Sequence, residues 1–146
     1  MAVMFVHQKA GAPDLHRRGM RPETASPDVL LTDVEADLVI RDGDCVVWSE
    51  TSFPVAELAC ALTYWLRQPD DERGDFAFQS MSYAEVGAVR IEESAGGWRV
   101  GSVFLPDTWA APVGWDFLVA AIRQFVSSVR QDVADIGIDP ALIPAL

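Results

Sequence analysis

The side chains that could take part in chemistry are few and widely spaced in this sequence. The only two histidines, His7 and His16, lie near the N-terminus without helical spacing and without a cysteine beside them. A nucleophilic site needs a base within hydrogen-bonding reach, and a zinc site needs three or four converging ligands. The sequence therefore predicts no catalytic residue, no metal ligand and no cofactor. It also lacks a GxSxG turn and a phosphate-binding glycine loop.

The cysteines and the N-terminal residues indicate a cytoplasmic protein. Cys45 and Cys60 fall in segments typical of a strand and a helix, without CxxC spacing. We expect two buried free thiols in a reducing cytoplasm rather than a disulfide. The N-terminal residues lack a positively charged region followed by a long apolar stretch, and no run of about 18 apolar residues occurs. We therefore expect neither export nor a membrane span.

One segment combines strand alternation with a strong turn signal. Apolar and polar residues alternate from Leu31 onward, which predicts a β-strand. Asp42-Gly43 is a pair favoured in two-residue type I′ turns, so we expect paired strands at about 32–41 and 44–51. Because side chains alternate between the two faces of a sheet, one face of this hairpin is expected to join the core and the other to stay open.

The open face of this hairpin is predicted to gather acidic side chains around one tryptophan. With this turn, Glu35 lies directly opposite Glu50, and like charges opposed across a sheet are destabilising. Trp48 is expected beside Asp37, which combines an aromatic anchor with a carboxylate rim. The candidate partner-binding residues are Asp33, Glu35, Asp37, Trp48 and Glu50.

Three interpretations of this acidic face remain open. It could be a recognition surface whose charge accelerates association with a basic partner. It could be a solvated face, because antiparallel sheets often expose one side to water. A metal site for hydrolysis formed by Glu35, Asp37 and Glu50 would need a cleft, which a flat sheet does not offer.

The overall charge narrows the range of partners. The 146 residues include 22 acidic and 11 basic ones, giving a net charge of −11. This charge repels nucleic-acid phosphates and anionic lipid headgroups, so we expect no nucleic acid and no membrane as a partner. A basic protein is the natural complement. The single lysine among the basic residues, with abundant Ala, Val and Asp, indicates a genome of high GC content.

The remaining pattern predicts one α+β domain. Residues 1–28 carry many Gly, Pro and charged residues and indicate an irregular arm with a short strand near its start, followed by a single domain over 29–146. Helical periodicity predicts a first helix from Pro54 to about Gln68 and a second from Leu118 to Ile136. Three further strands are expected at 75–82, 86–94 and 98–105. The fold is then an antiparallel sheet of about five strands with two helices packed on one face.

The last two strands and the aromatic residues allow finer expectations. A turn at Ala95-Gly96 would place Glu92 opposite Arg99. Trp109 and Trp115 lie in or just after a proline-containing loop and could form an exposed aromatic pair, a second candidate contact site, or pack under the second helix. We expect core packing from Trp65, Phe117 and Phe125, and contacts with the helices from Trp98 and Phe104.

Several segments resemble parts of known small bacterial proteins. They are Phe53-Pro54-Val55-Ala56-Glu57-Leu58 leading to Trp65-Leu66, the stretch Phe76 to Glu85, Gly97-Trp98-Arg99-Val100-Gly101-Ser102, and the helix ending near Gly137-Ile138-Asp139. Together, over roughly residues 30–139, they resemble small uncharacterised actinobacterial α+β domains. The layout is also similar to that of immunity proteins of bacterial toxin systems, which are compact, often acidic and block a toxin by direct contact. This resemblance implies an immunity- or antitoxin-type inhibitor and transfers no functional residue.

Two other functions remain open at this point. A small-molecule-binding module or small enzyme would use a pocket between the sheet and the loop of Trp109 and Trp115. A homodimer would cover the open sheet face with a second copy, although opposed carboxylates disfavour that pairing near neutral pH. We therefore expect a monomer or a homodimer.

Overall fold

Residues 2–146 are described by a computed structural model, in which Lys9 is described by its backbone alone. The protein has an α+β fold, as expected from the sequence. The helices are α1 (Pro13–Arg17), α2 (Pro27–Asp33), α3 (Val55–Arg67), α4 (Trp115–Asp135) and the short 3-10 helix η1 (Pro140–Leu142). The strands are β1 (Val3–Gly11), β2 (Glu35–Asp42), β3 (Cys45–Phe53), β4 (Phe76–Ala77), β5 (Arg90–Ser94), β6 (Gly97–Ser102) and β7 (Leu105–Trp109).

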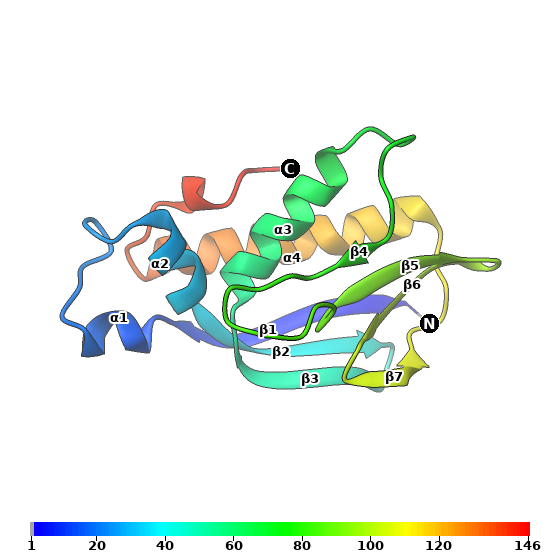
Figure 1. Cartoon of the computed structure of the whole chain (residues 1–146), viewed down its shortest axis with the longest axis horizontal. Helices are drawn as coiled ribbons and strands as arrows, with labels where there is room; N and C mark the ends of the chain where they lie inside the picture. Colours follow the sequence, from blue (N-terminus) through cyan, green and yellow to red (C-terminus); the bar gives the residue numbers. More distant parts are fainter. Residues whose placement is uncertain (1) are drawn as a thin grey trace.

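The strands form two antiparallel sheets rather than the single five-stranded sheet that was expected. One sheet has the order β1-β2-β3 and the other the order β4-β5-β6-β7, as Figure 1 shows. They meet through aromatic side chains: Trp48 of β3 stacks on Phe104 with ring centroids 5.9 Å apart, and Phe53 lies 5.6 Å from Phe78. The meander strands therefore pack against the end of the first hairpin without extending its sheet.

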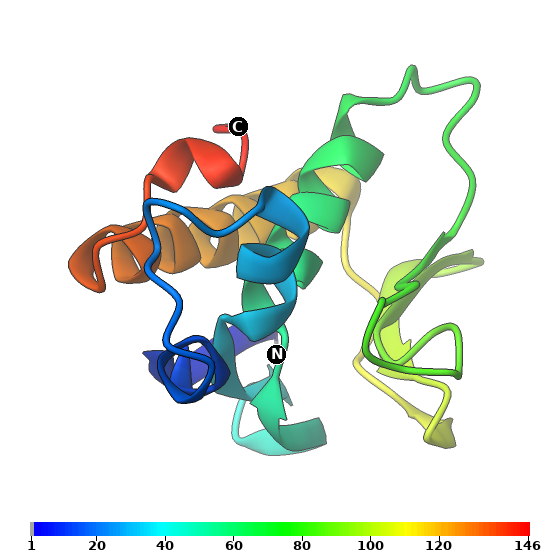
Figure 2. The same cartoon turned by 60° about the vertical axis from the view of Figure 1, so that its left-hand side comes forward.

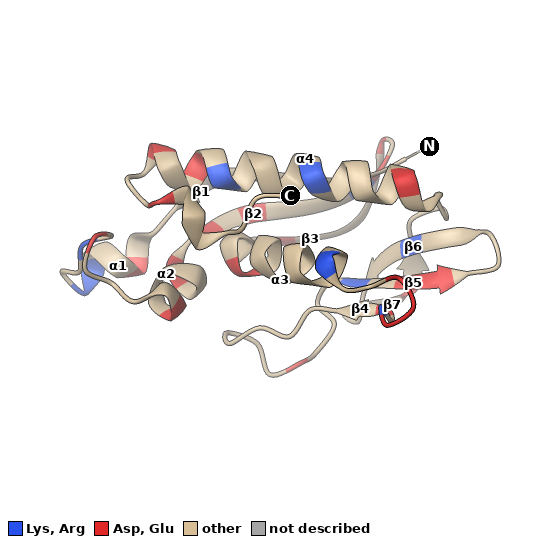
Figure 3. Ribbon diagram, turned by 90° about the horizontal axis from the view of Figure 1, so that it is seen from above, with Lys and Arg blue, Asp and Glu red and all other residues tan. Residues whose placement is uncertain are grey.

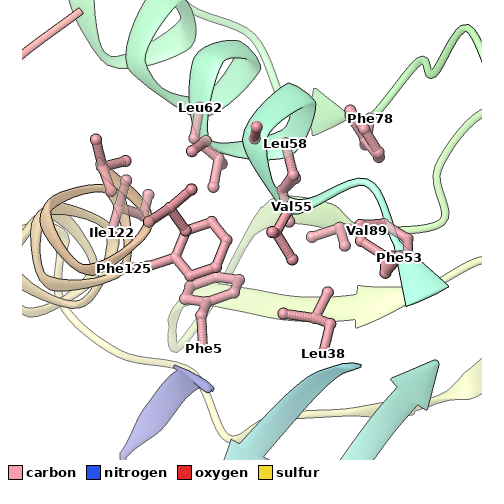
Figure 4. Packing of buried hydrophobic residues seen from close by; sticks show 14 of the residues in the cluster. Phe5, Leu38, Phe53, Val55, Leu58, Leu62, Phe78, Val89, Ile122 and Phe125 are labelled. Atoms are coloured by element: carbon pink, nitrogen blue, oxygen red, sulfur yellow. The ribbon is translucent and has the colours of Figure 1, made fainter. Parts of the chain in front are cut away.

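Helices α3 and α4 both cover the same face of the β1-β2-β3 sheet (Figures 1 and 2). Each helix directs a regular stripe of apolar side chains inward, and Leu58, Leu62, Ile122 and Phe125 are almost fully buried. Figure 4 shows Phe125 beside Phe5 of β1, with ring centroids 5.7 Å apart. Both helices agree closely with the periodicity of the sequence. Within residues 2–146, no helix covers the opposite face of this sheet.

The expectation of an irregular arm over residues 1–28 is wrong for most of that segment. Strand β1 continues to Gly11, well beyond a short initial strand, and pairs antiparallel with β2. Two short helices follow, each with a proline at its first or second position, where the missing N–H is not needed. The compact fold therefore includes residues well before position 29, and α2 replaces the start of the strand expected at 32–41.

The register of the first hairpin also differs from the expected one. Asp42 pairs with Cys45, so the two turn residues are Gly43 and Asp44, and Gly43 has a φ of 61°. Shifts at two places in the β2-β3 ladder then change the pairing further along β3. As a result, Glu50 lies opposite Leu38 rather than opposite Glu35.

The second predicted hairpin is confirmed. Strands β5 and β6 pair with Glu92 opposite Arg99 and Ile91 opposite Val100, around the turn at Ala95-Gly96. The arginine and the glutamate form an ion pair of 3.6 Å. The charged and the apolar pairs therefore support the register that the turn at Ala95-Gly96 predicted.

Candidate functional site

The helix-free face of the β1-β2-β3 sheet is the main open surface of this sheet. Leu38 and Ile40 of β2 are fully buried under the helices, so Asp37 and Val39 between them point to the other side. Gln8 of β1 is paired with Asp37, and Ser49 of β3 is paired with Val39. The face thus combines polar and apolar side chains from all three strands.

Two hollows adjoin each other on this surface. The larger, of about 400 Å³, is lined by Gln8, Asp37, Leu38, Val39, Ser49, Glu50 and Thr51. The smaller, of about 200 Å³, is lined by Gly11, Pro13, Glu35, Ala36, Asp37 and Ser52. The two hollows meet at Asp37, and the smaller one reaches Pro13 at the start of α1; we call the two together the depression.

Glu35 is held beside a second carboxyl group at the end of this depression. Partial burial raises the pKa of Glu35 above its ordinary value, and the negative charge of Asp14 and a hydrogen bond with its side chain raise it further. A hydrogen bond from Ser52 and the charge of Arg17 act in the opposite direction. Two carboxyl groups therefore share this corner, and Arg17 pairs with Asp14 at 2.7 Å.

Asp37 and Glu50 complete the group of acidic residues. Asp37 accepts a hydrogen bond from the backbone N–H of Ser52 at 3.3 Å. Burial raises the pKa of the Tyr83 hydroxyl, and the charges of Glu50 and then Glu35 add to this increase, so both carboxylates act on the same phenol. We call Asp14, Glu35, Asp37 and Glu50 the acidic cluster. Figure 3 shows acidic residues in α1, α2 and β2.

Ser52 is the backbone feature that shapes this site. It has a φ of 52° and stands in the left-handed region, which a residue with a side chain rarely adopts. It lies between Glu50 and Phe53, where the β2-β3 register shifts, and it lines the smaller hollow. The local distortion lets β3 bury Phe53 while it leaves Ser52 exposed beside Glu35.

Two of the predicted partner-binding residues lie elsewhere. Asp33 belongs to α2, not to a strand, is 6% exposed and forms an ion pair with Arg18. Trp48 is also 6% exposed; it stacks on Phe104 and lies edge-on to Phe53. The shift in register turned Trp48 inward, so the aromatic anchor predicted for the open face is part of the core. Glu35 and Asp37 remain on the open face; Glu50 lines the larger hollow but stands opposite the buried Leu38 in the strand pairing.

The expected aromatic pair of Trp109 and Trp115 is not formed. Trp109 lies beneath two guanidinium groups, with Arg99 3.9 Å and Arg90 4.3 Å from its ring centroid. Trp115 packs in a separate cluster, 5.2 Å from Trp98. The two tryptophans therefore belong to different parts of the molecule.

Two other aromatic expectations also need correction. Phe117, expected in the core, is 45% exposed. Phe104, expected to face the helices, is 40% exposed and stacks on Trp48 instead. Trp65, Trp98 and Phe125 do pack with the helices, as their spacing predicted.

The other titratable residues make contacts within the fold. Among residues 2–146, no three His, Cys, Asp or Glu side chains converge so as to hold a metal ion. His7 is bonded through Nε2 to Asp132 at 2.8 Å and lies edge-on to Phe125, which joins β1 to α4. The same part of the chain has no helix long and apolar enough to cross a bilayer.

Both cysteines are free, as expected, but only one of them is sheltered. Cys45 is exposed at the start of β3, whereas Cys60 on α3 is half-buried. Burial raises the pKa of the Cys60 thiol, and the nearby charge of Glu57 adds to the increase. The expectation of two buried thiols is therefore wrong for Cys45, because the turn begins one residue later than predicted.

Sequence reasoning missed several residues of the site. Asp14 was assigned to an irregular arm, although Pro13 followed by Asp14 is a common start of a helix. Ser52 and Tyr83 carried no pattern that pointed to the site. Gln8 could have been found only after β1 was recognised as a partner of β2.

The fold and site together define a small α+β protein with an open sheet face that ends in an acidic cluster. A family model described as a domain of unknown function, DUF7878, matches residues 15–135, from within α1 to the end of α4. The chain therefore belongs to the DUF7878 family. No curated protein and no solved structure matches it.

Proposed function

We propose that this chain is a non-catalytic interaction protein that binds a basic protein partner through the acidic cluster on its open sheet face. The observation that carries the proposal is the placement of Glu35 beside Asp14, at the end of a depression that α3 and α4 leave uncovered. Carboxyl groups held together in this way repel each other in the free protein. A cationic side chain seated between them would relieve that repulsion.

The depression supplies more than charge. Val39, Ser49 and Thr51 line its larger part, so a partner side chain would meet apolar and hydrogen-bonding groups beside the carboxylates of Asp37 and Glu50. Interfaces of this kind use complementary charge to guide association and close contacts to set the dissociation rate. The proposed mechanism is occlusion: the open face covers a basic functional surface of the partner.

An immunity- or antitoxin-type inhibitor fits this description best. The net charge of −11 favours a cationic target. The resemblance of the sequence to immunity proteins and to actinobacterial domains supports the same class, and the proposed setting is the cytoplasm of an actinobacterium. Binding by the open face would also explain why that face carries no helix.

The test is affinity capture of the partner from a lysate of the source organism. The bait is the whole chain, compared with the double variant Glu35→Lys/Asp37→Lys. A matched control, Asp71→Lys/Glu72→Lys, makes the same change in net charge in the exposed turn after α3. Thermal unfolding first checks that each variant is folded.

The proposal expects a basic protein that is retained by the wild type and by the control variant. The same protein should be lost from the Glu35→Lys/Asp37→Lys bait and at high salt. Capture of no basic protein, or equal capture by both double variants, would show that the acidic cluster is a solvated surface.

A further inference from the structure

A second hollow lies on the helical side of the molecule and gathers positive charge. It has a volume of about 350 Å³ and lies between the end of α3, the first half of α4 and the C-terminal residues. Arg67, Arg73 and Arg123 line it, no Asp or Glu side chain does, and the C-terminal residue Leu146 closes one end. Figure 3 shows basic segments of α3 and α4 on either side of the C-terminus.

This grouping is notable because the chain is strongly acidic. Three of its 11 basic residues line one hollow in a molecule with a net charge of −11. Electrostatic repulsion from the rest of the molecule keeps anions away from most of the surface. A cluster of arginines in a concave site creates a local exception to which an anion can bind.

Arg73 is the fixed part of this site. Its side chain is 8% exposed and donates hydrogen bonds to the carbonyl oxygens of Trp65, Leu66 and Gln68. It also forms an ion pair of 2.8 Å with Asp70, so its charge is already balanced and it acts as a structural part of the wall. Its guanidinium carbon lies 4.5 Å from the ring centroid of Trp115. These contacts close the C-terminal end of α3 and hold the indole of Trp115 in place as a wall of the hollow.

Arg67 and Arg123 are the cations available to a ligand. Arg67 is exposed and donates one hydrogen bond, of 2.8 Å, to the carbonyl oxygen of Ala145. Arg123 is exposed on α4. Neither arginine forms an ion pair with any side chain in the described part of the chain. Each guanidinium therefore keeps donors free for an oxyanion.

The rest of the hollow is apolar. Leu66 of α3, Val119 of α4 and Leu146 line it together with the Trp115 indole. An inorganic anion would leave these side chains without a partner, whereas a molecule with an apolar body would cover them. Ligand sites typically combine such apolar walls with a small number of orienting polar groups.

We propose that this hollow binds a small organic anion, in which one carboxylate or phosphate group is joined to an apolar body. The acidic group contacts Arg67 and Arg123, and the apolar body packs on Trp115, Val119 and Leu66. The site lies on the helical side of the β1-β2-β3 sheet, away from the acidic cluster. This inference therefore does not depend on the proposed protein partner.

The experiment titrates the whole chain with octanoate and with octyl phosphate by isothermal calorimetry. The neutral 1-octanol tests the need for charge, and acetate tests the need for the apolar body. In parallel, two-dimensional NMR follows the indole N–H signal of Trp115, assigned with the Trp115→Phe variant. The anion of the two that binds with the lower Kd shows whether the site prefers a carboxylate or a phosphate group.

The proposal expects saturable binding of at least one amphipathic anion with a shift of the Trp115 signal, and much weaker binding of acetate and 1-octanol. Replacement of an arginine by glutamine, Arg67→Gln or Arg123→Gln, should weaken binding by about tenfold, the effect of one charge-assisted hydrogen bond. The matched variant Arg21→Gln, in the exposed loop after α1, should bind like the wild type.

Three results would overturn the assignment. They are the absence of saturable binding for both amphipathic anions, equal binding of 1-octanol, and wild-type affinity in both the Arg67→Gln and the Arg123→Gln variants. Thermal unfolding of each variant separates a loss of binding from a loss of fold.

Discussion

The carboxyl group of Glu35 combines unfavourable local electrostatics with an open position. It is partly desolvated and lies within hydrogen-bonding distance of Asp14, so its ionised form is less stable in the folded protein than in the unfolded chain. A glutamate that is fully exposed to water and far from other carboxyl groups would have neither the desolvation nor the repulsion from Asp14. The position is therefore better suited to receiving a cation than to stabilising the isolated protein.

The first prediction at the residue scale is a pH-dependent gain in stability for Glu35→Gln. The pKa of Glu35 is raised in the folded state, so the folded protein binds the Glu35 proton more tightly than the unfolded chain does. The stability contributed by the protonated carboxyl group is therefore present at acidic pH. It is lost as the pH rises through the folded-state pKa of Glu35. The variant should be more stable than the wild type at pH 7, with the difference disappearing below about pH 4, under the ordinary range of a glutamate pKa.

Urea unfolding across this pH range measures the effect. Glu85→Gln, which alters an exposed glutamate, serves as the control and should show no such trend. A Glu35→Gln variant that is less stable than the wild type at pH 7 would contradict the account of the Asp14–Glu35 corner.

A second prediction at this scale concerns the thiols. Cys45 is exposed, whereas burial and the charge of Glu57 raise the pKa of Cys60, so its reactive thiolate is scarce near neutral pH. A thiol-specific disulfide reagent should react with the native protein in a fast and a slow phase, and Cys45→Ser should abolish only the fast one. Two equal rates in the native protein would refute the assignment.

At the scale of single elements, the two hairpins show which features of a strand pair can be predicted. The β5-β6 hairpin has both charged and apolar cross-strand pairs, and its register followed from the sequence. The β2-β3 hairpin carries two register shifts, and alternation alone cannot signal the extra residue of a bulge. The shift beside Ile40 placed Trp48 in the core, and the turn that begins one residue later than predicted placed Cys45 at the surface.

The β5-β6 turn provides the third prediction. Gly97 has a φ of 126°, and a Cβ atom there would lie 2.6 Å from the carbonyl oxygen of Val113. Gly97→Ala should destabilise the protein by about 2 kcal/mol or more, because both backbone strain and the clash oppose it. At the neighbouring Gly96 the nearest atoms are at 3.5 Å, so Gly96→Ala should change stability much less. Chemical denaturation that ranks the two equally would be inconsistent with this geometry.

The fourth prediction concerns the loop between β4 and β5. The buried Glu57 of α3 accepts hydrogen bonds from Ser80 Oγ at 2.6 Å and from the backbone N–H of Met81 at 2.8 Å. Glu57→Ala should cost about 2–3 kcal/mol, since two donors lose a charged acceptor. Amide exchange in residues 79–83 should also accelerate.

Glu57→Gln separates the role of this side chain as an acceptor from its role in packing. The amide keeps one acceptor oxygen, so both effects should be smaller than in Glu57→Ala. Unchanged amide exchange in Glu57→Ala would show that the loop is held by its apolar contacts alone.

At the scale of the whole molecule, periodicity predicted the elements better than their assembly. The spacing of apolar residues located α3 and α4 to within a few residues and identified the α+β class. The division into two sheets depends on contacts such as Trp48 with Phe104, between residues far apart in the sequence. Strand β1 was predicted only as a short strand, because the prolines and glycines that follow it suggested an irregular segment.

The candidate site was predictable to a similar extent. The open face and the placement of Glu35 and Asp37 on it followed from alternation along β2, because that pattern depends only on neighbouring residues. Asp14 and Tyr83 join the site through tertiary contacts, which no local pattern encodes. The arginine-lined hollow has the same origin, since its side chains come from α3, α4 and the loop that follows α3.

The most direct test of the proposed function is amide hydrogen exchange of the chain, free and in complex with the captured basic partner. We predict that the partner slows exchange in β2 and in residues 49–52 of β3, around the acidic cluster, and leaves α3 and α4 unchanged. Protection confined to α3, α4 or the β5-β6 hairpin, with none in β2 or β3, would contradict the claim that the open sheet face is the binding surface.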